Sequence, residues 1–172
     1  YVYKLNAPLV RAIKSRQNAD MVAAFQSVYE ELIAHGHKPA LHVLDNECSR
    51  AVKTYIRSNK TDIQLVEPHN HRVNAAEAAK AVKYHTLAHL ATIDPDCPLQ
   101  LWCKFVHQVQ LTLLLLRTAR NNNKMSAYEA LYNKNIDFNR TPVAPVGSKA
   151  VAFISPDERN SWQPHAMDAW YT

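Results

Sequence analysis

Short apolar segments of strand type alternate with segments of helical periodicity along most of this chain of 172 residues. Such alternation is typical of α/β domains, in which helices pack on the faces of a sheet. Only two glycines stand against nine prolines, which favours long helices with few tight glycine turns. The length suits one domain, or one domain with a small appendage. We therefore expect an α/β fold in which helices flank a mixed β-sheet.

The expected elements follow a definite order. Apolar and polar residues alternate on both sides of Asn6–Pro8 and predict strands at 1–6 and 8–13. Apolar residues at helical spacing predict a helix over 18–35, which Gly36 ends. The remaining predictions are strands at 40–44, 62–68 and 148–155, and helices at 48–59, 74–93, 99–118 and 126–132. We expect a core at 1–135 and a β-rich C-terminal extension at 136–172.

Charge and cysteine content restrict the partner and the compartment. The formal net charge of +5 permits a polyanionic partner such as nucleic acid, and is equally compatible with a merely basic domain. Three cysteines form no CxxC pair and leave one over in any pairing, so we expect free thiols and an intracellular location, cytoplasm or nucleus. The most apolar run, LWCKFVHQVQLTLLLL, is too short and too polar to span a bilayer, so no membrane association is expected.

Two acidic residues stand where an α/β sheet can bring them together. Asp45 follows the strand predicted at 40–44, and Glu77 lies in the first turn of the helix that begins at Asn74. Ligands of open α/β sheets bind at the carboxyl ends of strands. Neighbouring carboxylates repel unless a cation lies between them, and Mg²⁺ or Mn²⁺ is the natural guest. The alternative is structural, with Asp45 at a turn or cap and Asn74 and Glu77 close to capping-box spacing.

Four longer segments carry a more specific signal: LDNECSRAVKTYI, QLVEPHNHRVNAAEAAKAVKYH, DPDCPLQLWCKFVHQVQLTLLLLRTAR and MSAYEALYNKNIDFNRTPVAPVGSKAVAF. Together they resemble the integrase catalytic core of Copia-type retrotransposons, within the retroviral integrase superfamily. The resemblance covers nearly the whole chain and implies a ribonuclease-H-like fold. It also implies metal-dependent DNA strand transfer by two aspartates and a glutamate, with Asp45 as the second acid and Glu77 as the third.

The first acid of that family has no counterpart here. Where the family has acids in its first strand, this sequence has YVYKLN, with Val2 and Lys4 at the positions in question. A two-metal site needs that aspartate as its bridging ligand, and a nearby lysine competes with the cations. We therefore expect a degenerate integrase core that binds DNA and has weak or no strand-transfer activity. Two alternatives stay open: an active Mg²⁺-dependent polynucleotidyl transferase using Asp45 and Glu77, with Glu47 as a substitute acid, and a domesticated protein-interaction module.

The DNA contacts that the resemblance implies surround the glutamate. They are His69 and His71 in the loop before the helix, and Asn74, Lys80 and Lys83 on the helix. Basic side chains bind phosphates without reading sequence, although a solvated helix face explains the lysines equally well. Further basic clusters are Arg11, Lys14 and Arg16; Arg50, Lys53 and Arg57; and Arg117, Arg120 and Lys124.

Two helical features complete the predictions. His85 and His89 are four residues apart, a spacing that can bind zinc, but no third ligand is near in sequence, so we expect a helix-face pair without a metal. The apolar side chains of the helix predicted at 99–118 are expected to be mostly core. For the same region the resemblance implies a homodimer through the core helices.

Overall fold

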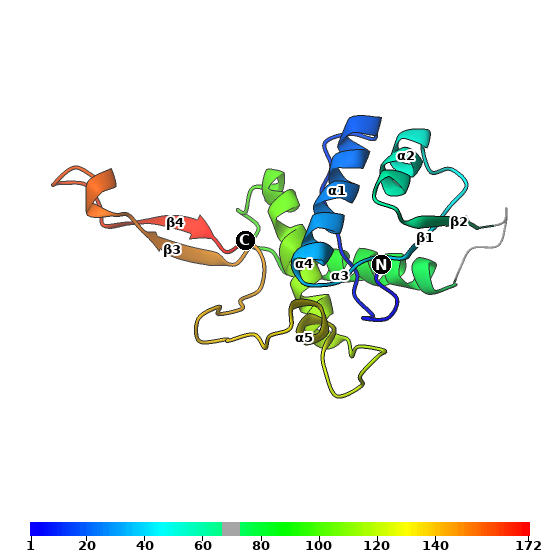
Figure 1. Ribbon diagram of the computed structural model, residues 1–172. Helices are drawn as coiled ribbons and strands as arrows, with labels where there is room; N and C mark the ends of the chain where they lie inside the picture. The colour runs from blue at the N-terminus through cyan, green and yellow to red at the C-terminus, as the bar shows by residue number, and fades with distance from the viewer. Residues whose placement is uncertain (67–72) are drawn as a thin grey trace.

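The computed structural model describes residues 1–66 and 73–172; the side chains of residues 73–76 lie outside that description. The elements in chain order are α1 (Asn18–Ala34), β1 (Leu41–Leu44), α2 (Arg50–Ser58), β2 (Asp62–Leu65), α3 (Val73–Ala91), η1 (Leu99–Leu101), α4 (Trp102–Leu116), α5 (Ala127–Tyr132), β3 (Lys149–Phe153), η2 (Pro156–Glu158) and β4 (Ala166–Trp170) (Figure 1). The chain is thus a mixed α/β protein, as the alternating pattern predicts. No helix in the described part of the chain is long and apolar enough to cross a membrane.

β1 and β2 form a parallel two-stranded sheet. The register runs from Leu41 opposite Asp62 to Leu44 opposite Leu65, and the Val66 N–H extends the ladder to the Leu44 carbonyl at 2.9 Å. α2 connects the two strands, because parallel neighbours need a crossover rather than a hairpin. Both strands therefore end at the same edge of this small sheet.

β3 and β4 form an antiparallel hairpin that projects away from the helices in Figure 1. Its base is fixed to the turn between α3 and α4, where the Gly147 carbonyl accepts the Asp94 N–H. Gly147 has a φ of +71°, and a Cβ atom there would lie 2.8 Å from the Ile93 side chain. The left-handed backbone and the close approach both require glycine. A β-rich segment near the C-terminus is therefore present, while the boundary between 135 and 136 stays a prediction.

The main core lies where α1, α4 and α5 meet the N-terminal segment. Its buried side chains are Leu5, Ala7, Leu32, Leu114, Ala119, Ala127, Ala130 and Leu131. A smaller cluster of Cys97, Phe105 and Val146 joins the base of the hairpin to α4. The expectation that the apolar helix is mostly core holds for Phe105 and Leu114, whereas Trp102 is half exposed.

The start of α5 follows from its sequence. Ser126 and Glu129 form a capping box, in which the Ser126 hydroxyl accepts the Glu129 N–H and the Glu129 carboxylate accepts the Ser126 N–H. Such reciprocal bonds satisfy two of the N–H groups that a helix start leaves without partners. The cap fixes the helix so that Leu131 enters the core, fully buried.

The N-terminal segment is not the pair of strands that the sequence predicts. Residues 1–13 form an isolated bridge between Val2 and Ala7, with hydrogen bonds of 2.8 and 3.2 Å. Asn6, between them, has a φ of +54°. Asparagine tolerates this left-handed conformation, which closes a turn and interrupts the extended run. The strand prediction at 1–6 is therefore wrong.

The strand prediction at 8–13 is also wrong. Pro8 has no N–H to donate, and the Val10 N–H donates to the side-chain oxygen of Gln110 in α4 at 2.6 Å. At Val10 the segment therefore bonds to a side chain of α4 and not to a neighbouring strand. The strands of the described residues form two separate two-stranded sheets. The described residues therefore do not form the single mixed sheet that a ribonuclease-H-like fold would have. The assignment of this chain to the ribonuclease-H-like fold stays a prediction.

Candidate nucleic-acid interface

Asp45 lies directly after β1, at the strand end that the sequence predicts. Its side chain is exposed, and Oδ1 accepts the Asn46 N–H at 2.7 Å. Its carbonyl accepts the Cys48 N–H at 3.1 Å. These bonds build the turn that leads into α2, whose N-cap is Ser49 and not Asp45. The carboxylate is therefore open to solvent and also helps to shape a turn.

Glu77 lies near the start of α3 and is exposed. Its Oε1 atom is 3.0 Å from the Lys80 ammonium, with both side chains about three-fifths exposed. Exposed pairs of this kind contribute only about 0.2–1 kcal/mol, so a cation or a phosphate can compete for either partner. In Figure 1 the start of α3 lies on the same side of the molecule as the carboxyl ends of β1 and β2.

The described residues do not complete a divalent-metal site. Among residues 1–66 and 73–172, no group of three His, Cys, Asp or Glu side chains is placed to hold a metal ion. Residues 1–19 contain no Asp or Glu and cannot supply the first acid of the resemblance. Two carboxylates, one of them paired with a lysine, do not fit the three-acid set of two-metal chemistry. Binding of Mg²⁺ or Mn²⁺ by Asp45 and Glu77 stays a prediction.

The residues predicted to contact DNA are only partly within the described structure. Lys80 and Lys83 are both exposed on α3, and Lys83 takes part in no ion pair of the described residues. Lysines three positions apart on a helix are surface neighbours, so both can reach one phosphate backbone. Asn74 lies in α3, but its side chain is outside the description. His69 and His71 lie outside the described residues.

His85 and His89 lie in the seam between α3 and α4, with ring centroids 4.5 Å apart. The Thr112 hydroxyl donates to the Gln108 carbonyl at 2.9 Å and lies within hydrogen-bond distance of His85 Nε2, at 2.7 Å. Burial lowers the pKa of both imidazoles, and the charge of His85 lowers the pKa of His89 further. The pair thus joins two helices. The sequence reasoning did not single out Thr112. The one clue to its role is that it carries the only hydroxyl in the apolar run LTLLLL.

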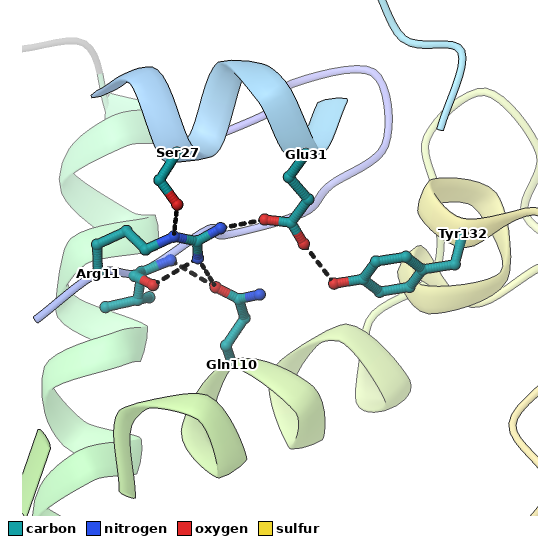
Figure 2. A network of polar contacts seen from close by, with 6 residues as sticks. Arg11, Ser27, Glu31, Gln110 and Tyr132 are labelled. Atoms are coloured by element: carbon teal, nitrogen blue, oxygen red, sulfur yellow. Dashed lines mark hydrogen bonds and ion pairs between the residues drawn. The ribbon is translucent and has the colours of Figure 1, made fainter. Parts of the chain in front are cut away.

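A second polar cluster that sequence analysis missed joins the N-terminal segment to three helices (Figure 2). Arg11 forms an ion pair with Glu31 of α1 and donates from Nε to Ser27 at 3.1 Å. Its Nη1 atom donates to Gln110 of α4 at 3.2 Å. The Tyr132 hydroxyl donates to Glu31 at 2.7 Å, and burial together with that carboxylate raises the pKa of the phenol. The Arg11 guanidinium is therefore engaged in contacts within the fold. It is not a free cation of the basic cluster predicted with Lys14 and Arg16.

Comparisons with known proteins add one distant neighbour. No protein-family model and no curated protein matches this sequence. A comparison with solved structures matches a chain in the simian T-cell lymphotropic virus intasome in complex with PP2A regulatory subunit B56 gamma. The match has a TM-score of 0.41 and 14% sequence identity, and covers 92% of this chain and 58% of that chain. A TM-score at this level does not establish a common fold, and the resemblance to Copia-type integrases stays a prediction.

Proposed function

We propose that this chain is an integrase-core-like DNA-binding protein with an incomplete acidic site and with weak or no strand-transfer activity. The proposal rests mainly on the sequence and conformation of the N-terminal segment. It contains no acid through residue 19, and it is a turn whose Lys4 carbonyl accepts the N–H groups of Arg120 and Asn121. The first ligand of a two-metal site is therefore missing from the segment that the resemblance assigns to it.

DNA binding is assigned to the exposed face of α3 that carries Lys80 and Lys83. The supporting observations are the exposure of both ammonium groups, the weak tether of Lys80 to Glu77, and the net charge of +5. Phosphate contacts of this kind give affinity without base readout and weaken as salt rises. Asp45 and Glu77 then act as negative charges at the rim of the DNA surface.

The test measures binding and joining with the same protein and the same labelled DNA duplex. We expect binding at low salt and no joined product with Mg²⁺ or Mn²⁺ present. Joined product that Glu77→Gln abolishes would establish the active alternative, a transferase using Asp45 and Glu77. Absence of binding at low salt would reject the DNA-binding proposal itself.

A protein-interaction module is the second candidate, because the hairpin and its loop expose large apolar side chains. Val151 and Phe153 are each more than two-thirds exposed, and Trp162 is 98% exposed. Exposed apolar residues gathered on one projecting element are a common mark of a partner surface. Under this candidate, Phe153→Ser with Trp162→Ser abolishes capture of a protein partner and leaves DNA binding unchanged.

A homodimer through the core helices is proposed as well. The supporting observation is exposed apolar area on α4, where Trp102 is 51% and Leu116 is 75% exposed. Burying such side chains is worth about 25 cal/mol per Å² of apolar surface. Sedimentation of the wild type and of Trp102→Ser tests it: a dimer that the substitution leaves intact would place the interface elsewhere.

A further inference from the structure

The N-terminal turn and the connection between α4 and α5 form one basic and aromatic surface. The longer stretches that contain these two segments, residues 1–19 and 97–128, have no Asp or Glu. The guanidinium carbon of Arg120 lies 4.2 Å from the centre of the Tyr3 ring and 6.0 Å from that of Tyr1. Cation–π contacts at these distances hold a guanidinium over aromatic rings. The surface thus combines fixed positive charge with aromatic faces.

Hydrogen bonds pre-organise this surface. The Lys4 carbonyl accepts the backbone N–H groups of Arg120 and of the next residue, both at 3.1 Å. The Asn6 side chain accepts the Tyr1 hydroxyl at 2.7 Å and donates to the Thr118 carbonyl at 2.9 Å. A bound ligand therefore does not have to order these two segments, which lowers the entropic cost of binding.

The charged groups of this surface are not neutralised by acids. Lys4, Arg120 and Lys124 are exposed, and the ion pairs of the described residues include none of them. Tyr3 keeps 55% of its surface exposed beside them. Aromatic rings next to positive charge are the combination that binds single-stranded nucleic acid, because bases stack on the rings while the cations hold the phosphates.

We propose that this surface binds unpaired nucleotides of single-stranded nucleic acid, with a base stacked on the face of the Tyr3 ring opposite Arg120 and flanking phosphates held by Arg120 and Lys124. Stacking on an aromatic ring suits every base, so binding should be nearly independent of sequence. The surface is built from elements other than the lysine face of α3. It therefore does not rest on the function proposed above, and the Lys80→Gln/Lys83→Gln variant should keep it.

The test uses two fluorescent ligands of equal length, an oligothymidylate and an abasic oligonucleotide with the same phosphates, in anisotropy titrations at low salt. Wild type should prefer the oligothymidylate. Tyr3→Leu should weaken oligothymidylate binding by about fivefold or more and leave abasic binding unchanged. Arg120→Gln should weaken both ligands. The matched controls Phe138→Leu and Arg140→Gln, two exposed positions after α5, should stay within about twofold of wild type on both ligands.

Several results would overturn the proposal. One is equal affinity of wild type for the two ligands, and another is binding by Tyr3→Leu and Arg120→Gln within about twofold of wild type. Displacement of the oligothymidylate by polyglutamate at equal charge concentration would identify an acidic-peptide surface instead. If Tyr3→Leu fails to fold by circular dichroism, Lys124→Gln takes its place, and an unchanged affinity for both ligands then rejects the proposal.

Discussion

The backbone N–H of Arg120 donates to the carbonyl of Lys4 at 3.1 Å, and this bond ties the N-terminal turn to the loop that follows α4. Lys4 stands at a sequence position where the integrase resemblance calls for an acid. The turn that contains Lys4 packs on helices through Leu5 and Ala7. It also carries a cation–π contact, in which the Arg120 guanidinium lies over the Tyr3 ring. Within residues 1–66 and 73–172, no three His, Cys, Asp or Glu side chains are grouped so that they could hold a metal ion.

Gly147 and Gly36 provide a matched pair for the packing of the hairpin base. Both have positive φ, +71° and +81°, but a Cβ atom meets Ile93 at Gly147 and nothing within 4 Å at Gly36. We expect Gly36→Ala to lower the free energy of unfolding by about 1–2 kcal/mol, from backbone strain alone. Gly147→Ala should cost about 1–3 kcal/mol more, from overpacking. Urea unfolding measures both, and equal losses would contradict the close approach of Gly147 to Ile93.

The Arg11–Glu31 pair should contribute to stability because both side chains are more than four-fifths buried. Glu31→Gln leaves the guanidinium without its charged partner and should cost about 1–3 kcal/mol. Tyr132→Phe removes one hydrogen bond to Glu31 and should cost about 1 kcal/mol. The control is Glu30→Gln on the exposed side of α1, expected within about 0.5 kcal/mol of wild type. If Glu31→Gln behaves like Glu30→Gln, the cluster does not stabilise the fold.

The histidines of the α3–α4 seam make stability depend on pH. Burial lowers the pKa of His85 and His89 below the ordinary value of 6.5, so the unfolded chain binds more protons than the native state just below that pH. Stability is therefore fully present above about pH 6.5 and is lost as the pH falls toward the native pKa values. Burial also lowers the pKa of His42, which adds to the same trend.

The measurement is the free energy of unfolding between about pH 7 and pH 5. His85→Gln with His89→Gln should flatten the decline seen in wild type without abolishing it, because His42 remains. His107→Gln, an exposed position on α4, is the control and should leave the decline unchanged. If stability declines as steeply with falling pH in the double variant as in wild type, burial in the α3–α4 seam does not lower the pKa values of His85 and His89.

Metal binding offers a direct check on the incomplete acidic site. A site with a dissociation constant tenfold below the Mn²⁺ concentration would add about 1.4 kcal/mol to stability. We expect millimolar Mn²⁺ to leave the melting temperature of wild type unchanged, and equally that of Glu77→Gln and Asp45→Asn. A rise in wild type that both substitutions remove would instead support the active transferase.

The parts of the fold that sequence predicts well depend on neighbours along the chain. α5 is an example, since Ser126 and Glu129 are three residues apart and cap the helix by themselves. The position of Asp45 after β1 follows equally from a local apolar pattern. Such elements need no information about distant segments.

The missed features depend on interactions between residues far apart in sequence. Tyr132 and Glu31 are 101 residues apart, and His85 and Thr112 are 27 apart, so no local pattern announces either bond. Apolar alternation predicts strands at the N-terminus, but its apolar side chains, such as Leu5 and Ala7, pack on helices. Asn6 turns the chain there with a left-handed φ, and its side chain donates to the carbonyl of Thr118, 112 residues away.

DNA binding by α3 is tested most directly by the salt dependence of affinity for a DNA duplex. Lys80→Gln/Lys83→Gln should reduce the steepness of log affinity against log salt by about 0.9 for each phosphate that the variant no longer neutralises. The control, Lys104→Gln/Lys134→Gln, changes two exposed lysines elsewhere and should keep the wild-type slope. Glu77→Gln should bind more tightly than wild type, because it removes a negative charge and releases Lys80. Equal slopes for wild type and both double variants, with no gain from Glu77→Gln, would contradict DNA binding by this face.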